Sequence, residues 1–248
     1  MAETFRRHEK KYILTKAQHD ELEQLISTHM KRDKFCETKP YLIRNVYLDT
    51  LNNDMVRISC DKPVYKEKLR VRKYGEYNDG LNDYYLEIKR KYAGVVYKRR
   101  VKLTKEELHS FTLKGIIPSN KTPLETQILK EMKYLFKIYN PVPKSFISYE
   151  RTAYYDVDDS EFRLTFDENL FSRRDDFSFD NMEKETVLLP EGYYLMEVKV
   201  GAGMPLWFAN ALSKINARPG SFSKYGTDFK ELTRKGDSYA SSSIWYNT

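Results

Sequence analysis

Charged and apolar side chains alternate along several short stretches of this chain. Between residues 68 and 72, the cations Lys68, Arg70 and Arg72 alternate with the apolar residues Leu69 and Val71. Successive side chains of a β-strand point to opposite faces, so this pattern predicts a strand with one cationic and one apolar face. The alternation recurs where the polar faces carry Arg7, Glu9 and Lys11; Glu87, Lys89 and Lys91; Lys98, Arg100 and Lys102; Arg163 and Asp167; and Glu197 and Lys199.

The same patterns predict an α+β fold. Two-residue periodicity between turn residues predicts strands over Arg6–Leu14, Tyr41–Asp49, Lys66–Tyr74, Tyr84–Tyr92, Val95–Leu103, Phe146–Asp156, Phe162–Asp167 and Tyr193–Val200. Apolar residues at helical spacing predict helices over Thr15–Lys31, Thr104–Leu113, Pro123–Tyr139 and Leu206–Ile215. We expect one domain over residues 5–236, which suits a chain of 248 residues, and a loose tail over residues 237–248.

Composition adds an expectation about partners. The formal net charge is +7 at pH 7, which favours an anionic partner. The N-terminus lacks the apolar stretch of a signal peptide, and no segment has the about 20 apolar residues of a membrane-spanning helix. We therefore expect a cytoplasmic protein, which a partner protein would bring to any membrane. The two cysteines form no CxxC pair and the four histidines are scattered, which argues against a zinc site.

The cationic strand faces have two interpretations. A sheet with its apolar face on the core and its charged face in water is the simpler one. However, cations dominate the polar faces of many strands, and Glu-x-Lys recurs at Glu9/Lys11, Glu87/Lys89 and Glu197/Lys199. If the sheet closes as a barrel, these faces point inward, and a bound polyanion relieves the repulsion among the cations. The carboxylates would then hold Mg²⁺ or Mn²⁺ together with phosphate oxygens.

Nine short segments, in this order, resemble the polyphosphate polymerase domain of the vacuolar transporter chaperone type, within the triphosphate tunnel metalloenzyme superfamily. The segments are Arg7–Tyr12, Val46–Thr50, Lys68–Gly75, Leu86–Lys91, Tyr97–Arg100, Ser148–Tyr154, Phe162–Asp167, Leu195–Lys199 and Ser221–Gly226. They span nearly the whole chain. The resemblance implies an eight-stranded antiparallel β-barrel, the triphosphate tunnel, with basic faces inside and helices packed outside.

The resemblance also implies a phosphotransferase reaction. The γ-phosphate of ATP would pass to the end of a polyphosphate chain, with Mn²⁺ or Mg²⁺ as cofactor. The residues that carry over as phosphate ligands are Lys11, Arg70, Arg72, Lys89, Lys98, Arg151, Arg163 and Lys224. Further substrate contacts are expected at Arg100, Lys199 and Arg218, and metal ligands at Glu197 and Glu9.

Two positions depart from the family's pattern. Arg7 stands where the superfamily has the first carboxylate of its N-terminal Glu-x-Glu-x-Lys motif, which fits the polymerase branch better than the triphosphatase branch. Ser221 stands where the family often has a second lysine, three residues before Lys224. Either Arg218 substitutes for that lysine or one phosphate contact is lost.

Other functions stay open. A triphosphatase would use the same tunnel, with water in place of the acceptor phosphate and tripolyphosphate or nucleoside triphosphates as substrates. A non-catalytic module would bind polyphosphate or another polyanion without turnover. Nucleic-acid binding is not expected, because the cations lie within strand patterns rather than in an exposed stripe or arm.

Overall fold

The computed structural model describes residues 8–77, 79–93, 95–159, 161–201, 203–234 and 236. The chain divides into two compact units. Unit 1 comprises Met1–Leu42, Ser148–Phe171 and Val187–Ser223, and unit 2 comprises Ile43–Ile147, Ser172–Thr186 and Lys224–Thr248. Strands β7 (Val142–Asp156) and β8 (Arg163–Arg173) have residues in both units. The expected tail over residues 237–248 and the predicted strand positions Arg6 and Arg7 lie outside the described residues.

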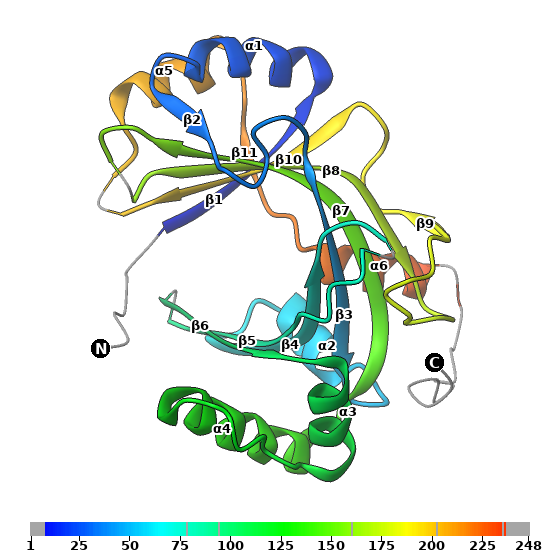
Figure 1. Ribbon diagram of the computed structural model, residues 1–248. Helices are drawn as coiled ribbons and strands as arrows, with labels where there is room; N and C mark the ends of the chain where they lie inside the picture. The colour runs from blue at the N-terminus through cyan, green and yellow to red at the C-terminus, as the bar shows by residue number, and fades with distance from the viewer. Residues whose placement is uncertain are drawn as a thin grey trace. The chain divides into compact units, whose positions relative to one another are not determined.

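Unit 1 is a sheet covered by helices. Its elements are β1 (His8–Thr15), α1 (Lys16–Ile26), β2 (Met30–Arg32), β10 (Tyr193–Val200), α5 (Leu206–Lys214) and β11 (Pro219–Gly220), with β9 (Thr186–Val187) at its boundary with unit 2. The strands are ordered β11-β1-β10-β8-β7, and α1 and α5 lie over one face of this sheet (Figure 1). Leu22 of α1 and Phe208 of α5 are fully buried against Leu164, Met196 and the other apolar residues of the strands. The apolar halves of the alternating strands therefore form the core of this unit.

A capping box fixes the start of α1. The Thr15 side chain accepts a hydrogen bond from the Gln18 backbone N–H, and the Gln18 side chain accepts one from the Thr15 N–H. These contacts satisfy donors that a helix N-terminus leaves without partners, so Thr15 is the N-cap of α1. The helix ends at Ile26, not at Lys31 as predicted, because Met30–Arg32 pairs with β7 as strand β2.

Unit 2 contains a sheet of four strands, which the first residues of β7 extend. Its further elements are β3 (Tyr41–Asp49), α2 (Asp54–Cys60), β4 (Tyr65–Tyr74), β5 (Tyr84–Tyr92), β6 (Val95–Leu103), α3 (Lys105–Lys114), α4 (Pro123–Tyr139) and α6 (Lys224–Arg234). The strands are ordered β7-β3-β4-β5-β6, and α3 and α4 lie along one face of them (Figure 1). Val71, Leu86 and Val101 of the sheet pack with Leu129 and Met132 of α4 in one buried cluster.

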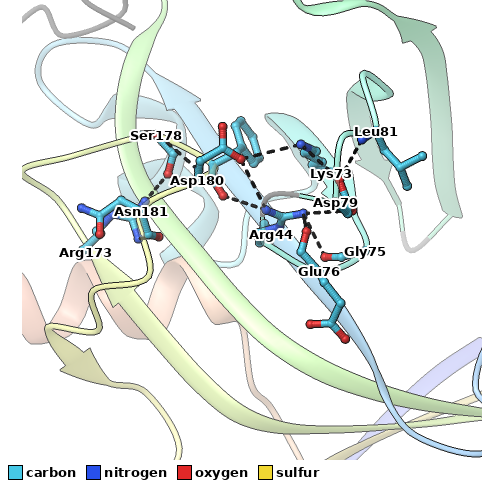
Figure 2. Close-up of polar contacts among 11 residues, drawn as sticks. Arg44, Lys73, Gly75, Glu76, Asp79, Leu81, Arg173, Ser178, Asp180 and Asn181 are labelled. Carbon is cyan, nitrogen blue, oxygen red and sulfur yellow. Dashed lines mark hydrogen bonds and ion pairs between the residues drawn. The ribbon is translucent and has the colours of Figure 1, made fainter.

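Two buried arginines hold the loops of unit 2 (Figure 2). The guanidinium of Arg44, on β3, donates hydrogen bonds of 2.8–2.9 Å to the backbone oxygens of Phe179, Gly75 and Glu76. Arg173, at the end of β8, donates to the backbone oxygens of Asp176, Ser178, Asn181 and Glu183. The β4–β5 connection and the segment after β8 are thus fixed by buried side chains instead of by regular secondary structure.

The α+β class and the antiparallel pairing of the sheet are confirmed. All eight predicted strands are present, with β2, β9 and β11 as short additions. The strand order is β11-β1-β10-β8-β7-β3-β4-β5-β6. No pairing joins β6 to β11 within the part of the chain that the structure describes, so the predicted closed eight-stranded barrel is not confirmed. Among the helices of the described residues, none is long and apolar enough to cross a membrane.

Candidate phosphate-binding faces

Backbone pairing in unit 2 aligns the predicted cationic strand faces in rows. Arg70 pairs with Tyr47 on β3 and with Glu87 on β5, and Glu87 pairs with Arg100 on β6. The next row along the strands contains Lys68, Lys89 and Lys98. Because paired residues of an antiparallel sheet share a face, these side chains form one surface. We call it the cation face, consisting of Lys68, Arg70, Arg72, Lys89, Lys98 and Arg100.

The opposite face of the same strands packs on α4. Arg90 and Arg99, which interrupt the apolar pattern there, are paired with carboxylates: Arg90 Nε lies 2.7 Å from Glu67 Oε1, and Arg99 Nη1 lies 2.9 Å from Glu131 Oε1. These arginines thus have structural partners on the helix side of the sheet.

Glu87 is the carboxylate of the cation face. Its Oε2 lies 2.7 Å from both Nε and Nη2 of Arg70, and its Oε1 lies 2.9 Å from Nζ of Lys98. Burial raises the pKa of Glu87, but the positive charges of Arg70, Arg72 and Lys98 outweigh this effect and hold the pKa well below its usual range. Burial lowers the pKa of Lys98 to about 7, with Glu87 opposing and the two arginines reinforcing that change. Lys98 therefore titrates near neutral pH.

Lys224 lies close enough to the cation face for its charge to act on Tyr47. Burial raises the pKa of the Tyr47 phenol, but the charges of Arg70, Lys68, Lys224 and Arg72 outweigh burial and lower it overall. Lys224 is the buried first residue of α6. Its neighbour Tyr225 stacks on Tyr47, with ring centroids 4.6 Å apart, so α6 is packed against β3 where the cation face begins.

Asp49 anchors this arrangement. The Tyr225 hydroxyl donates to Asp49 Oδ2 at 2.9 Å, and the backbone N–H groups of Met55 and Val56 donate to the same carboxylate at 2.8 and 2.9 Å. Asp49 thus connects α6 to the start of α2.

Unit 1 carries a second polar face, on β1, β10 and β8. Lys11 pairs with Glu197, which pairs with Thr165. Glu9, Lys199 and Arg163 form the neighbouring row. We call this surface the Glu197 face. Lys11 Nζ lies 3.0 Å from Glu197 Oε1 and 3.5 Å from Glu9, and it donates to the Phe222 backbone oxygen at 3.0 Å.

Arg151 approaches the second carboxylate oxygen of Glu197. Its Nε and Nη2 donate to the two oxygens of Asp167 at 2.5 and 2.7 Å, and its Nη2 lies 3.8 Å from Glu197 Oε2. Asp167 is fully buried, so it fixes the guanidinium of Arg151 in one orientation. Glu197 therefore lies between two cations of its own unit.

Comparison with known families shows which family the chain belongs to. The VTC domain family matches residues 6–233. The chain belongs to the VTC domain family. Among solved structures, its fold is similar to that of a candidate adenylate cyclase from Bacillus halodurans, with a TM-score of 0.50 and 15% sequence identity over 91% of this chain and 95% of that chain. At 15% identity this similarity concerns the fold alone. The fold of the chain resembles the triphosphate tunnel fold. No curated protein matches the chain.

Among the residues that the structure describes, the carboxylates of this VTC domain do not form a closed metal cage. No group of three or more His, Cys, Asp or Glu side chains that could hold a metal occurs among the described residues. Mg²⁺ is often bound by one or two carboxylates together with substrate phosphates. Glu197 and Glu9, which both approach Lys11, fit that second arrangement as oxygen donors.

The structure divides the predicted site residues of the VTC domain between the two units. Unit 2 contains Arg70, Arg72, Lys89, Lys98, Arg100 and Lys224, and unit 1 contains Lys11, Arg151, Arg163, Lys199, Arg218, Glu197 and Glu9. Arg218 is exposed immediately before β11, whose Gly220 pairs with Lys11. Its predicted substitution for the missing lysine stays a prediction.

Some residues of the faces were not singled out from the sequence. Asn45 accepts a 2.8 Å hydrogen bond from Arg72 Nε, and Tyr47 accepts one of 3.3 Å from Arg70 Nη1. The two-residue spacing of Asn45, Tyr47 and Asp49 could have indicated that β3 contributes a polar face. Their role as partners of the arginines depends on the β3–β4 register, which no local pattern shows.

Proposed function

We propose that this VTC domain transfers the γ-phosphate of ATP to the end of a growing polyphosphate chain in a metal-dependent reaction. The observation that carries the proposal is the cation face, where arginines and lysines of three neighbouring strands gather around Glu87 and leave an excess of positive charge. An excess of cations on a partly buried face favours a ligand with several regularly spaced negative charges.

The reaction needs no general base. The attacking group is a phosphate oxygen that is already anionic, and the main obstacle is repulsion between two phosphates. Positioning and charge neutralisation supply most of the catalysis of such a transfer. Arg70 and Arg72 offer planar, forked donors that suit phosphate oxygens, and Lys89 and Lys98 add point charges.

A divalent cation would supply further positive charge to the phosphates. When bound, Mn²⁺ or Mg²⁺ would neutralise charge on the phosphate oxygens. We assign Glu197 as its main protein ligand and Glu9 as a second. Lys11 and Arg151 would keep the Glu197 carboxylate oriented while they also bind phosphate.

A triphosphatase is the second candidate. Glu9 favours it, because this carboxylate lies near Lys11 on the Glu197 face and is able to orient a water molecule. Hydrolysis would use the same cations, with water as the acceptor.

Incubation of the purified chain with ATP and Mn²⁺, with long polyphosphate and free phosphate both quantified, separates the candidates. Polyphosphate that grows with time supports the proposal. Free phosphate without polymer indicates a triphosphatase. If neither product forms while tripolyphosphate raises the unfolding temperature, the chain is a binding module and the catalytic proposal is wrong.

A further inference from the structure

The proposed reaction assigns no role in substrate or metal binding to Glu87, although this residue lies among the cations. Its side chain is 1% exposed, at the centre of the cation face. Both of its oxygens contact cations that are expected to bind phosphate, Arg70 at 2.7 Å and Lys98 at 2.9 Å. Glu87 therefore contacts these cations through both of its oxygens, which suits a carboxylate that orients them.

We infer that Glu87 is a positioning residue that holds Arg70 and Lys98 in the orientation in which they bind a phosphate chain. The inference rests on the proposed function, since it concerns the same cations. Glu87 fixes Arg70 through Nε and Nη2, while Nη1 contacts the Tyr47 hydroxyl at 3.3 Å. The guanidinium is therefore held from two sides before any ligand arrives, which lowers the entropy that binding must remove.

The opposite face of the sheet provides the comparison that separates positioning from simple stabilisation. There, Glu67 binds Arg90 with the same 2.7 Å contact to Nε, and the Glu67 side chain is 5% exposed. Both pairs join β4 to β5 and both bury a carboxylate. Of these two carboxylates, Glu87 contacts residues that are expected to bind phosphate and Glu67 does not.

Glu87 also controls the charge of Lys98. The charged groups that surround Lys98 are Glu87 and Lys89 on β5, Arg70, Arg72 and Lys68 on β4, and Arg100 on β6, with Tyr47 of β3 and Lys224 of α6 beyond Arg70. Among these, Glu87 is the carboxylate that favours the protonated form of Lys98. Without its charge, the remaining cations lower the pKa of Lys98 further.

The test measures tripolyphosphate affinity by titration calorimetry between about pH 6 and pH 9, a range that spans the titration of Lys98. Wild type is compared with Glu87→Gln, Glu87→Asp and the matched control Glu67→Gln, after circular dichroism has confirmed folding. Loss of the Glu87 charge also removes its repulsion of the ligand, which changes the affinity at every pH. The diagnostic quantity is therefore the midpoint of the affinity's pH dependence, that is, the pH at which half of the change in affinity has occurred. Titration of tripolyphosphate itself is common to all variants.

We expect Glu87→Gln to move the midpoint down by about one pH unit or more, each unit being tenfold in the protonation equilibrium. Glu87→Asp keeps the charge but has a shorter reach, so a smaller move is expected, and Glu67→Gln should match wild type. An unchanged midpoint in Glu87→Gln, or an equal move in Glu67→Gln, overturns the inference. If Glu87→Gln does not fold, an unchanged midpoint in Glu87→Asp overturns it. Wild type that binds no tripolyphosphate overturns the proposed function itself, and this inference with it.

Discussion

The charge of Lys98 changes near neutral pH. Burial and the neighbouring guanidinium groups lower its pKa to about 7, so a large fraction of Lys98 is neutral in the free protein above that pH. A bound phosphate chain places negative charge beside the ammonium and favours its protonated form. Affinity for a phosphate chain is therefore expected to fall as the pH rises through 7, and binding above pH 7 should take up a proton.

Calorimetry in buffers of different ionisation enthalpy measures this proton uptake. At a pH of about 8, one unit above the pKa of Lys98, we expect tripolyphosphate binding to take up more protons in wild type than in Lys98→Arg. Arginine stays charged throughout this range, so it removes the titration and keeps the positive charge. Equal uptake in the two proteins would show that Lys98 is not the group that titrates.

Glu197 makes a separate prediction at the scale of one residue. Glu197→Gln keeps the shape of the side chain but removes the charge that a divalent cation needs. We expect loss of Mn²⁺-dependent turnover of ATP, with metal-free tripolyphosphate affinity kept or raised because Lys11 is released from its ion pair. Product assays and calorimetry check the two parts. Glu191→Gln, an exposed carboxylate before β10, is the control, and full turnover in Glu197→Gln would reject the assignment.

At the scale of elements, the strands were readable from the sequence because each face alternates locally. The Lys68–Arg72 pattern predicted a cationic face on β4, and the β4–β5 register places Lys68 beside Lys89. Helix α2 was missed because its first turn is held by the carboxylate of Asp49 and not by a cap of its own. Helix α6 was missed because its first turn contains Gly226 and a buried Lys224, which weaken a helical pattern.

The loops of unit 2 depend on contacts that Arg44 makes with residues distant in the sequence. Its side chain is fully buried, donates to three backbone oxygens and lies 3.7 Å from Asp79 and 3.9 Å from Asp180 (Figure 2). Arg44→Met leaves those acceptors without a donor. We expect it to lower the free energy of unfolding by about 3 kcal/mol, as removal of one partner from a buried charged network does.

Urea unfolding measures this loss. Arg99→Met is the control, because the partly exposed pair of Arg99 with Glu131 should contribute less than about 1 kcal/mol. Equal, small losses in both variants would show that the buried contacts of Arg44 do not hold the loops.

At the scale of the whole molecule, the chain belongs to the VTC domain family and carries one polar, cation-bearing face in each of its two units. The alternation predicted that charged residues share a face on β4, β5, β6 and β10, but it did not predict the polar partners Asn45 and Tyr47 of β3. The predicted closure of the sheet is not confirmed within the described residues, and no local pattern indicates whether strands as distant in sequence as β6 and β11 pair. The central claim concerns the cation face of unit 2, which we propose binds a phosphate chain.

Two matched ion pairs on opposite faces of β4 and β5 allow that claim to be tested in one titration. Arg70 pairs with Glu87 on the cation face and Arg90 pairs with Glu67 on the helix face, each with a 2.7 Å contact. Tripolyphosphate is titrated into wild type, Arg70→Met and Arg90→Met by calorimetry. We predict that Arg70→Met weakens binding by at least about tenfold, as truncation of a buried charged contact does, while Arg90→Met binds like wild type. Equal affinity in all three proteins, or an equal loss in both variants, would contradict the assignment of the cation face as the phosphate-binding surface.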